Sequence, residues 1–342
     1  MTQKRAVVLG TGAWGTTFAQ VLADANMKVD IWGRREDVVE FINAGENTPY
    51  LPGIELPAAI SATTSMREIL HEGPAPDMVV IAVPTAAVGE VAAEAKVGDI
   101  ETLVMSLSKG VEPETYRTVD QIISEEGGVD PQRLAVLSGP NLSREIAERQ
   151  PAATVVASES WETARQLAIW CHNSYFRPYV STDVIGCEMA GATKNVIALA
   201  IGAADGMGLG TNTRSTLMTR GLAECTRLGI AMGARAETYS GLAGMGDLIA
   251  TCSSKLSRNY SLGVRLGKGM TLAEAISLSP GVAEGARSAR PILDLADSYG
   301  VEMPITAGAV AVLEGKATVA EMGEMLLERP QKADGWQIEL LD

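Results

Sequence analysis

The first half of the chain alternates short apolar runs with stretches of helical spacing. The runs are almost continuously apolar, which is typical of a parallel sheet covered on both faces rather than of half-exposed strands. We interpret the following runs as strands: residues 5–9, 28–32, 78–83, 102–107, 134–137, 153–157 and 176–183. Helical patterns at 14–25 and 115–126 lie between them, so we expect repeated strand–helix–strand units with right-handed crossovers.

The strand signals stop near residue 183. The sequence beyond is rich in Ala, Gly and Leu with helical spacing, and predicts helices at 184–204, 212–232, 246–253, 258–267, 283–299, 305–314 and 318–327. We therefore predict an α/β protein with a mostly parallel sheet domain over residues 1–182 and an all-helical domain over residues 183–342.

A glycine pattern joins the first expected strand to the first expected helix. Residues 10–15 read Gly-Thr-Gly-Ala-Trp-Gly. In a Rossmann-type unit, Gly10 permits the tight turn, Gly12 lets a diphosphate approach the backbone, and Gly15 allows close packing of helix on strand. The helix N-terminus then offers free N–H groups to the anion. The pattern predicts dinucleotide binding; the alternative is a glycine-rich turn without a ligand.

The end of the second expected strand bears on the choice of cofactor. An NAD-specific site has an acidic residue there that binds the ribose hydroxyls. Asp30 falls too early in this strand, and Arg34 and Arg35 occupy the expected place. Because guanidinium groups bind phosphates and stack on adenine, we predict NADP as cofactor, alone or alongside NAD. The alternative is two solvated arginines.

Lys194 lies on an apolar face of the expected helix 184–204. Its helical neighbours are all small or apolar, namely Cys187, Ala190, Gly191, Ile197, Ala198 and Ile201. An ammonium group on a packed face is costly to bury and responds with a lowered pKa, which suits a general acid or base. The alternative is a lysine that reaches water or pairs structurally.

Other polar residues follow the expected strands or open the expected helices. Lys109 and the segment 138–141 come after strands, where open α/β sheets bind ligands. Asp247 precedes an apolar run and is either functional or a helix cap. Residues 257–259, Ser-Arg-Asn, open a helix and suit a phosphate; the alternative is a cap beside a surface arginine.

Composition narrows the classes of function. The chain has 342 residues, 28 basic against 42 acidic, and a net charge of −14, which argues against nucleic acid or an anionic membrane as its main partner. Four cysteines without CxxC spacing suggest buried thiols in a reducing compartment. We find no apolar run approaching a membrane span, no signal-peptide core and no cluster of metal ligands. We therefore expect a cytoplasmic protein without membrane insertion or a metal.

Several motifs together carry a resemblance along residues 4–330. They are GTGAWGTT, WGRR, VPT, SLSKG, LSGPN, GATKNVIALAIG, LGTNTRSTLMTRGLAE, GLAGMGDLIATC, SRNYSLG, VAEG and EMPI. With them the chain resembles the bacterial NAD(P)-dependent glycerol-3-phosphate dehydrogenases. The resemblance implies reversible hydride transfer between NAD(P)H and dihydroxyacetone phosphate. It also implies a product, sn-glycerol 3-phosphate, for membrane lipid synthesis, an active site between the two domains, and a homodimer.

The resemblance also implies roles for individual residues. Lys194 matches the family's proton donor, Asp247 the acid that orients it, and Lys109 a lysine that touches both substrate and cofactor. Further positions match substrate contacts: Gly139, Asn141, Ser257, Arg258 and Asn259, with Arg258 as the phosphate clamp. Positions that match cofactor contacts, beside the glycine turn, are Ala13, Trp14, Arg34, Arg35, Lys109, Ser143, Arg258, Val282 and Glu284.

Two other functions compete with this interpretation. One is a different dehydrogenase with a Rossmann-type and a helical domain, such as a ketopantoate reductase or a 6-phosphogluconate dehydrogenase. The other is a cofactor-sensing protein without catalysis. The GMGDL and SRN segments favour the glycerol phosphate enzyme, and the retained Lys109, Lys194 and Asp247 speak against a sensor.

Overall fold

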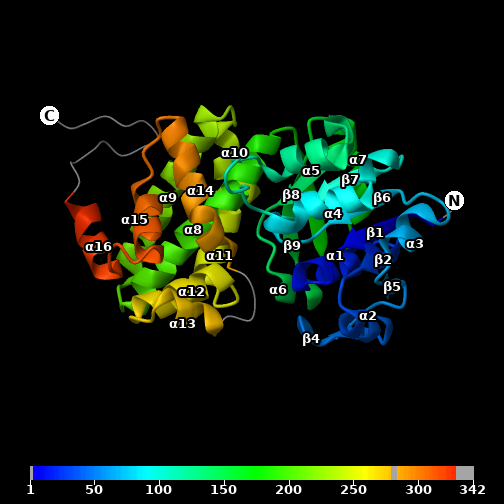
Figure 1. Cartoon of the computed structure of the whole chain (residues 1–342), viewed down its shortest axis with the longest axis horizontal. Coiled ribbons are helices and arrows are strands. Elements are labelled where there is room, and N and C mark those ends of the chain that lie inside the picture. The colour runs from blue at the N-terminus through cyan, green and yellow to red at the C-terminus, as the bar shows by residue number, and fades with distance from the viewer. Residues whose placement is uncertain (1–2, 279–282, 329–342) are drawn as a thin grey trace. The chain divides into compact units, whose positions relative to one another are not determined.

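The computed structural model describes residues 3–278 and 283–328, which form two compact units (Figure 1). The first unit contains the chain up to Lys109 together with Arg117–Cys187, and the second contains Gly110–Tyr116 and the chain from Glu188 onward. The first is built on an eight-stranded, mostly parallel sheet and the second is helical. The predicted fold class is confirmed.

The sheet of the first unit contains every strand that the sequence predicts. Its spatial order is β10-β9-β8-β7-β6-β1-β2-β5. The strands are β1 (Arg5–Leu9), β2 (Lys28–Trp32), β5 (Ile60–Thr63), β6 (Met78–Ile81), β7 (Leu103–Ser106), β8 (Leu134–Ser138), β9 (Ala152–Ala157) and β10 (Phe176–Ser181). β5, an edge strand of only four residues, was not predicted from the sequence.

One pairing in the sheet breaks the expected run of strand–helix–strand crossovers. β8 and β9 pair antiparallel, whereas β9 and β10 pair parallel to one another. The link between β8 and β9 carries only the five-residue helix α6 (Ser143–Ala147). A helix of five residues rises only about 7.5 Å, which is less than the roughly 16 Å length of a five-residue strand. α6 therefore does not carry the chain back along the sheet, and β9 runs antiparallel to β8.

Helices cover both faces of the sheet, as the continuously apolar strands predict. Alternate strand residues enter two separate cores: Val8 and Val80 pack on one face, and Val7 and Val79 on the other. The first core includes α1 (Ala13–Asp24), α6 and α7 (Trp161–Cys171). The second includes α3 (Met66–His71), α4 (Val88–Ala95) and α5 (Val119–Gly127).

The helix predicted at 115–126 begins later than expected, because Thr118 forms a capping box with Gln121 that starts α5 at Val119.

A small hairpin is inserted between β2 and β5. It follows α2 (Glu36–Asn43) and consists of β3 (Glu46–Asn47) and β4 (Leu51–Glu55), paired antiparallel. The sequence analysis did not predict it, since its strands are short and carry little alternation. It lies beside α2 at the lower end of the unit in Figure 1.

The helical unit contains all seven helices that the sequence predicts. They are α8 (Val184–Gly206), α9 (Thr211–Ala231), α11 (Asp247–Ser253), α12 (Arg258–Gly267), α14 (Glu284–Ser298), α15 (Pro304–Leu313) and α16 (Val319–Leu327). Three further elements of this unit were not predicted from the sequence: α10 (Ala236–Ser240), the π-helical turn η4 (Leu242–Gly246) and α13 (Leu272–Ser277).

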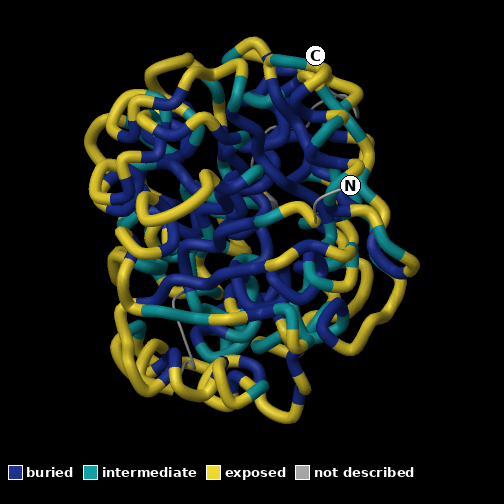
Figure 2. Tube along the Cα trace, turned by 90° about the vertical axis from the view of Figure 1, so that its right-hand side faces the viewer, coloured by how far each residue is buried: buried dark blue, intermediate teal, exposed yellow. Residues whose placement is uncertain are grey.

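Helix α8 is the buried centre of this unit, and its glycines allow backbone contact with α12. A Cβ on Gly202 would lie 2.1 Å from the Tyr260 carbonyl oxygen, and one on Gly263 would lie 2.0 Å from that of Leu199. By length and composition α8 could cross a membrane, which the sequence analysis did not anticipate. However, 83% of its most apolar window is buried inside the protein. Figure 2 shows such buried stretches inside the trace and exposed ones at its surface.

Candidate active site

The glycine turn has the shape that a bound diphosphate requires. Gly10 has a φ of +131°, and a Cβ there would lie 2.6 Å from the Ala82 carbonyl oxygen. A Cβ on Gly15 would lie 2.3 Å from the Gly10 carbonyl oxygen, so both positions need glycine for packing. Among the described residues, apart from Gly12 and its two chain neighbours, no atom lies within 4 Å of a Cβ built on Gly12. The space beside Gly12, at the start of α1, therefore fits the diphosphate of a dinucleotide.

The end of β2 carries its two arginines on the surface. Asp30 is turned away from that end, because its carboxylate accepts hydrogen bonds from Arg5 Nε at 2.8 Å and Ser61 Oγ at 2.6 Å. Arg34 and Arg35 are exposed. The hydrogen-bonded Asp37 carboxylate raises the pKa of the Arg35 guanidinium, and Arg35 in turn lowers the pKa of Asp37. Two exposed guanidinium groups thus follow the end of β2, and that of Arg35 is paired with Asp37.

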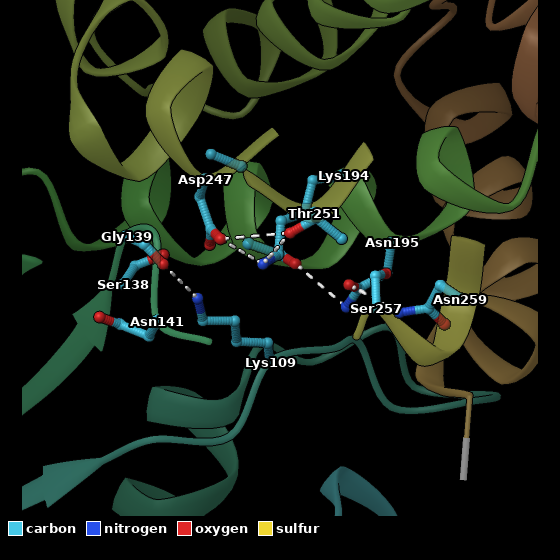
Figure 3. Close-up of polar contacts among 12 residues, drawn as sticks. Lys109, Ser138, Gly139, Asn141, Lys194, Asn195, Asp247, Thr251, Ser257 and Asn259 are labelled. Atoms are coloured by element: carbon cyan, nitrogen blue, oxygen red, sulfur yellow. Dashed lines mark hydrogen bonds and ion pairs between the residues drawn. The ribbon is translucent and has the colours of Figure 1, made fainter. Parts of the chain in front are cut away.

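The loops after β7 and β8 bring three predicted site residues together in the first unit (Figure 3). Lys109 Nζ donates a hydrogen bond to the Gly139 carbonyl oxygen at 3.3 Å. Asn141 Nδ2 donates to Thr154 Oγ1 at 3.1 Å. Asn141 Oδ1 and Ser138 Oγ are buried and lack a hydrogen-bond partner within residues 3–278 and 283–328. Buried orphan polar atoms of this kind suit a polar ligand.

Lys194 is buried in the helical unit with 8% of its surface exposed. Its Nζ lies 2.5 Å from Asp247 Oδ1 and 2.9 Å from Thr251 Oγ1 (Figure 3). The expected burial of this lysine is confirmed, but the ammonium is paired rather than isolated. An acid partner offsets the cost of burying a charge, since an isolated ammonium would lose its hydration without compensation.

Asp247 is the first residue of α11 and directly follows the π-helical turn η4. Gly246 before it has helical φ and ψ angles, and no side chain caps the helix. Asp247 is therefore not a helix cap, and that alternative is wrong. The backbone instead continues from η4 into α11 and directs the Asp247 carboxylate onto Lys194 of α8. Asp247 is only 1% exposed.

The start of α12 carries the third group of predicted residues. Ser257 caps the helix, since its Oγ accepts a hydrogen bond from the Tyr260 N–H at 3.3 Å. Arg258 is exposed. Asn259 is buried: its Nδ2 donates to Asn195 Oδ1 at 2.9 Å and its Oδ1 accepts from the Gly285 N–H at 2.8 Å. The Ser257 hydroxyl thus caps α12, and the exposed Arg258 is the first residue of that helix.

Comparison with known proteins identifies the family. Residues 5–164 match the model of the NAD-dependent glycerol-3-phosphate dehydrogenase N-terminus, and residues 183–324 match that of its C-terminus. The chain belongs to the NAD-dependent glycerol-3-phosphate dehydrogenase family.

Individual relatives agree with the family models. One relative is the NAD(P)+-dependent glycerol-3-phosphate dehydrogenase of Streptomyces griseus. It is 51% identical over 325 residues, which cover 94% of this chain and 96% of the relative. One of Corynebacterium diphtheriae is 51% identical over 331 residues, covering 96% and 99%.

A solved structure of the same family has the same fold. The crystal structure of glycerol-3-phosphate dehydrogenase from Coxiella burnetii matches with a TM-score of 0.90 at 35% identity, covering 96% of this chain and 99% of that one. The predictions of the family, of the oxidoreductase class and of a nicotinamide cofactor are confirmed.

The structure adds two residues to those that the sequence suggested for this glycerol-3-phosphate dehydrogenase family member. Thr251 contacts Lys194, and Asn195 holds Asn259. Thr251 follows Asp247 by four residues, which places both on one face of a helix. That spacing could have identified Thr251 from the sequence, whereas nothing local in the sequence pairs Asn195 with Asn259.

The remaining predicted cofactor contacts lie at helix starts. Ala13 and Trp14 begin α1, and Ser143 begins α6, where its carbonyl oxygen accepts a hydrogen bond from Thr17 Oγ1 at 3.3 Å. Glu284 begins α14, and burial raises the pKa of its carboxyl group against the opposing effect of nearby arginines. Val282 lies outside the described residues.

The described residues contain no group of three or more His, Cys, Asp or Glu side chains arranged to hold a metal ion. All four cysteines are buried, and burial raises the pKa of the Cys252 thiol. These thiols are buried as the sequence analysis expects.

Proposed function

We propose that this chain catalyses reversible hydride transfer between NAD(P)H and dihydroxyacetone phosphate, with sn-glycerol 3-phosphate as the reduced product. The observation that carries the proposal is the buried Lys194 ammonium, held by Asp247 and Thr251 in a member of this family. Its product would serve glycerophospholipid synthesis.

Lys194 is the proton donor in the direction of reduction. The bound nicotinamide supplies the hydride, and negative charge then develops on the carbonyl oxygen of the substrate. A cation about 3 Å from that oxygen stabilises the charge and can transfer a proton to it. In the reverse direction the neutral Nζ takes the proton from the alcohol.

Asp247 and Thr251 act through Lys194. The carboxylate accepts from Nζ at 2.5 Å, and the hydroxyl oxygen lies 2.9 Å from the same nitrogen. These two partners fix the position and direction of Nζ. The pair thereby holds the lysine in one rotamer, so that less entropy is lost when the substrate binds.

The substrate phosphate binds at the start of α12 in this proposal. Arg258 supplies the positive charge, and the helix N-terminus supplies a favourable dipole. Ser257 and Asn259 contribute polar groups. The resemblance implies that Lys109, Gly139 and Asn141 also contact the substrate, which the buried orphan oxygen of Asn141 supports.

The cofactor binds along the glycine turn in this proposal. Gly10, Gly12 and Gly15 form the turn, and the open space beside Gly12 supports a diphosphate there. Arg34 and Arg35 favour the 2′-phosphate of NADP through charge. The other contacts that we propose are Ala13, Trp14, Lys109, Ser143, Arg258, Val282 and Glu284.

We further propose that the protein is cytoplasmic and forms a homodimer. The four buried cysteines, without CxxC spacing, support a reducing compartment. The dimer rests on the family resemblance, and sedimentation of the purified protein measures it.

A substrate panel tests the proposed activity. Purified protein is mixed with NADPH or NADH and with dihydroxyacetone phosphate or ketopantoate, and, for the oxidative direction, with NADP+ or NAD+ and 6-phosphogluconate. Absorbance of the reduced nicotinamide is followed. We expect rapid oxidation with dihydroxyacetone phosphate only. The ratio of rates with NADPH and NADH measures the contribution of Arg34 and Arg35. Turnover of another substrate, or cofactor binding without any turnover, would contradict the proposal.

A further inference from the structure

Asn47 connects the β3–β4 hairpin to the glycine turn. Its side chain is completely buried. Nδ2 donates one hydrogen bond to the Thr11 carbonyl oxygen at 2.9 Å and another to Thr16 Oγ1 at 2.7 Å. Thr11 stands between Gly10 and Gly12, and Thr16 lies in the first turns of α1.

The three groups form a closed set of hydrogen bonds. Thr16 Oγ1 accepts from Asn47 and donates to the Thr11 carbonyl oxygen at 3.3 Å. The Thr11 carbonyl therefore has two donors, both buried or partly buried. Its direction is fixed from the hairpin side as well as from α1.

The fixed carbonyl determines where the next N–H group points. No peptide bond among the described residues is cis, and in a planar trans peptide the C=O and N–H groups point in opposite directions. The Gly12 N–H therefore points away from Asn47. Gly12 has a φ of −65° and a ψ of 168°, and its Cβ side is open.

Glycine makes this peptide easy to rotate. A turn of the Thr11–Gly12 peptide by half a circle would bring Gly12 to a positive φ, which only glycine adopts at little cost. In the rotated form a carbonyl oxygen would face the anion in place of an N–H donor. Glycine gives the ligand access to the turn but also lets the peptide rotate. A group outside the turn is therefore needed to hold the peptide in one orientation.

We propose that Asn47 is a positioning residue for cofactor binding, which holds the Thr11–Gly12 peptide so that the Gly12 N–H faces the diphosphate. The inference rests on the proposed function, since it requires a dinucleotide on this turn. It assigns a role to the inserted hairpin, whose Pro52 carbonyl oxygen also accepts a hydrogen bond from Arg144 of α6.

The test compares two asparagines of the same unit. Asn47→Leu keeps the side-chain size and removes both donors. Asn43→Ala is the control: Asn43 also makes two hydrogen bonds, to the Ala62 carbonyl oxygen at 2.9 Å and from the Ala62 N–H at 2.8 Å, but does not contact the turn. Calorimetric titration without substrate gives the Kd of NADPH, of NADH and of adenosine 2′-monophosphate, which has no diphosphate.

For Asn47→Leu we expect the Kd of both dinucleotides to rise about tenfold, because the competent turn is populated a tenth of the time. The Kd of adenosine 2′-monophosphate and the kcat at saturating cofactor stay near the wild-type values. Asn43→Ala leaves all dinucleotide constants unchanged.

Two results would overturn the inference. One is a folded Asn47→Leu protein with the wild-type affinity for NADPH, and the other is an equal loss of affinity for adenosine 2′-monophosphate. Should Asn47→Leu not fold, Thr16→Val decides: a rise of about threefold in the NADPH Kd supports the inference, and no rise overturns it. Wild-type protein that binds neither dinucleotide refutes the proposed function, and this inference with it.

Discussion

At the scale of single residues, glycine is needed for different reasons at different positions of the turn. Gly10 and Gly15 are glycines because the fold leaves no room for a side chain. Gly12 has room for one in the folded protein. In the proposed function that space takes the diphosphate, so this six-residue motif combines a folding requirement at Gly10 and Gly15 with a binding requirement at Gly12.

Substitution of these glycines by alanine distinguishes the two requirements. We predict that Gly10→Ala lowers the free energy of unfolding by more than about 1 kcal/mol, because alanine is strained at this φ and overlaps Ala82. Gly12→Ala leaves stability nearly unchanged but weakens NADPH binding. Denaturant titration and calorimetric binding measure the two effects. A Gly12→Ala protein with full affinity would show that the diphosphate does not approach this atom.

At the scale of helices, a buried carboxyl group joins two of them. Glu224 of α9 is 2% exposed, and its carboxylate accepts hydrogen bonds from the N–H groups of Ile305 at 2.7 Å and Thr306 at 3.3 Å. These donors are the free N–H groups at the start of α15. Burial raises the pKa of Glu224 to about 7, although its backbone donors and Arg227 oppose the shift.

The raised pKa predicts a dependence of stability on pH. The unfolded chain loses the Glu224 proton near the ordinary pKa of about 4.3, whereas the folded chain keeps it until about 7. Between these values the folded state binds more protons, so stability falls as the pH rises. Glu224→Gln cannot ionise, and we expect its stability to improve relative to wild type between pH 5 and pH 8. Urea titrations of wild type and Glu224→Gln at pH 5 and pH 8 measure this. A difference in stability that is the same at both pH values would contradict the raised pKa of Glu224.

Some elements could not be predicted from the sequence because their causes are not local. The short strands of the sheet were predictable because burial on both faces makes each of them almost continuously apolar. The antiparallel direction of β9 depends on the short length of α6. β3 and β4 have too few residues to show a hydrophobic pattern. The π-helical turn η4 has only the five residues Leu-Ala-Gly-Met-Gly, too few for a helical pattern, yet it directs Asp247 onto Lys194.

At the scale of the whole molecule, each unit contains one part of the proposed machinery. The sheet unit provides the glycine turn, the exposed arginines and the loops with Lys109 and Asn141. The helical unit provides Lys194 with its two partners and the start of α12. The sequence suggested most of these residues, but the Thr251 and Asn195 contacts depend on how helices far apart in sequence pack together.

The central claim is that Lys194 transfers the proton that accompanies hydride transfer. The most direct measurement is the kcat of Lys194→Met with dihydroxyacetone phosphate and NADPH, together with the NADPH Kd of the same protein. We predict a loss in kcat of roughly 10²–10⁴-fold, the usual contribution of a general acid, with the Kd unchanged. A variant that turns over at nearly the wild-type rate would contradict the account.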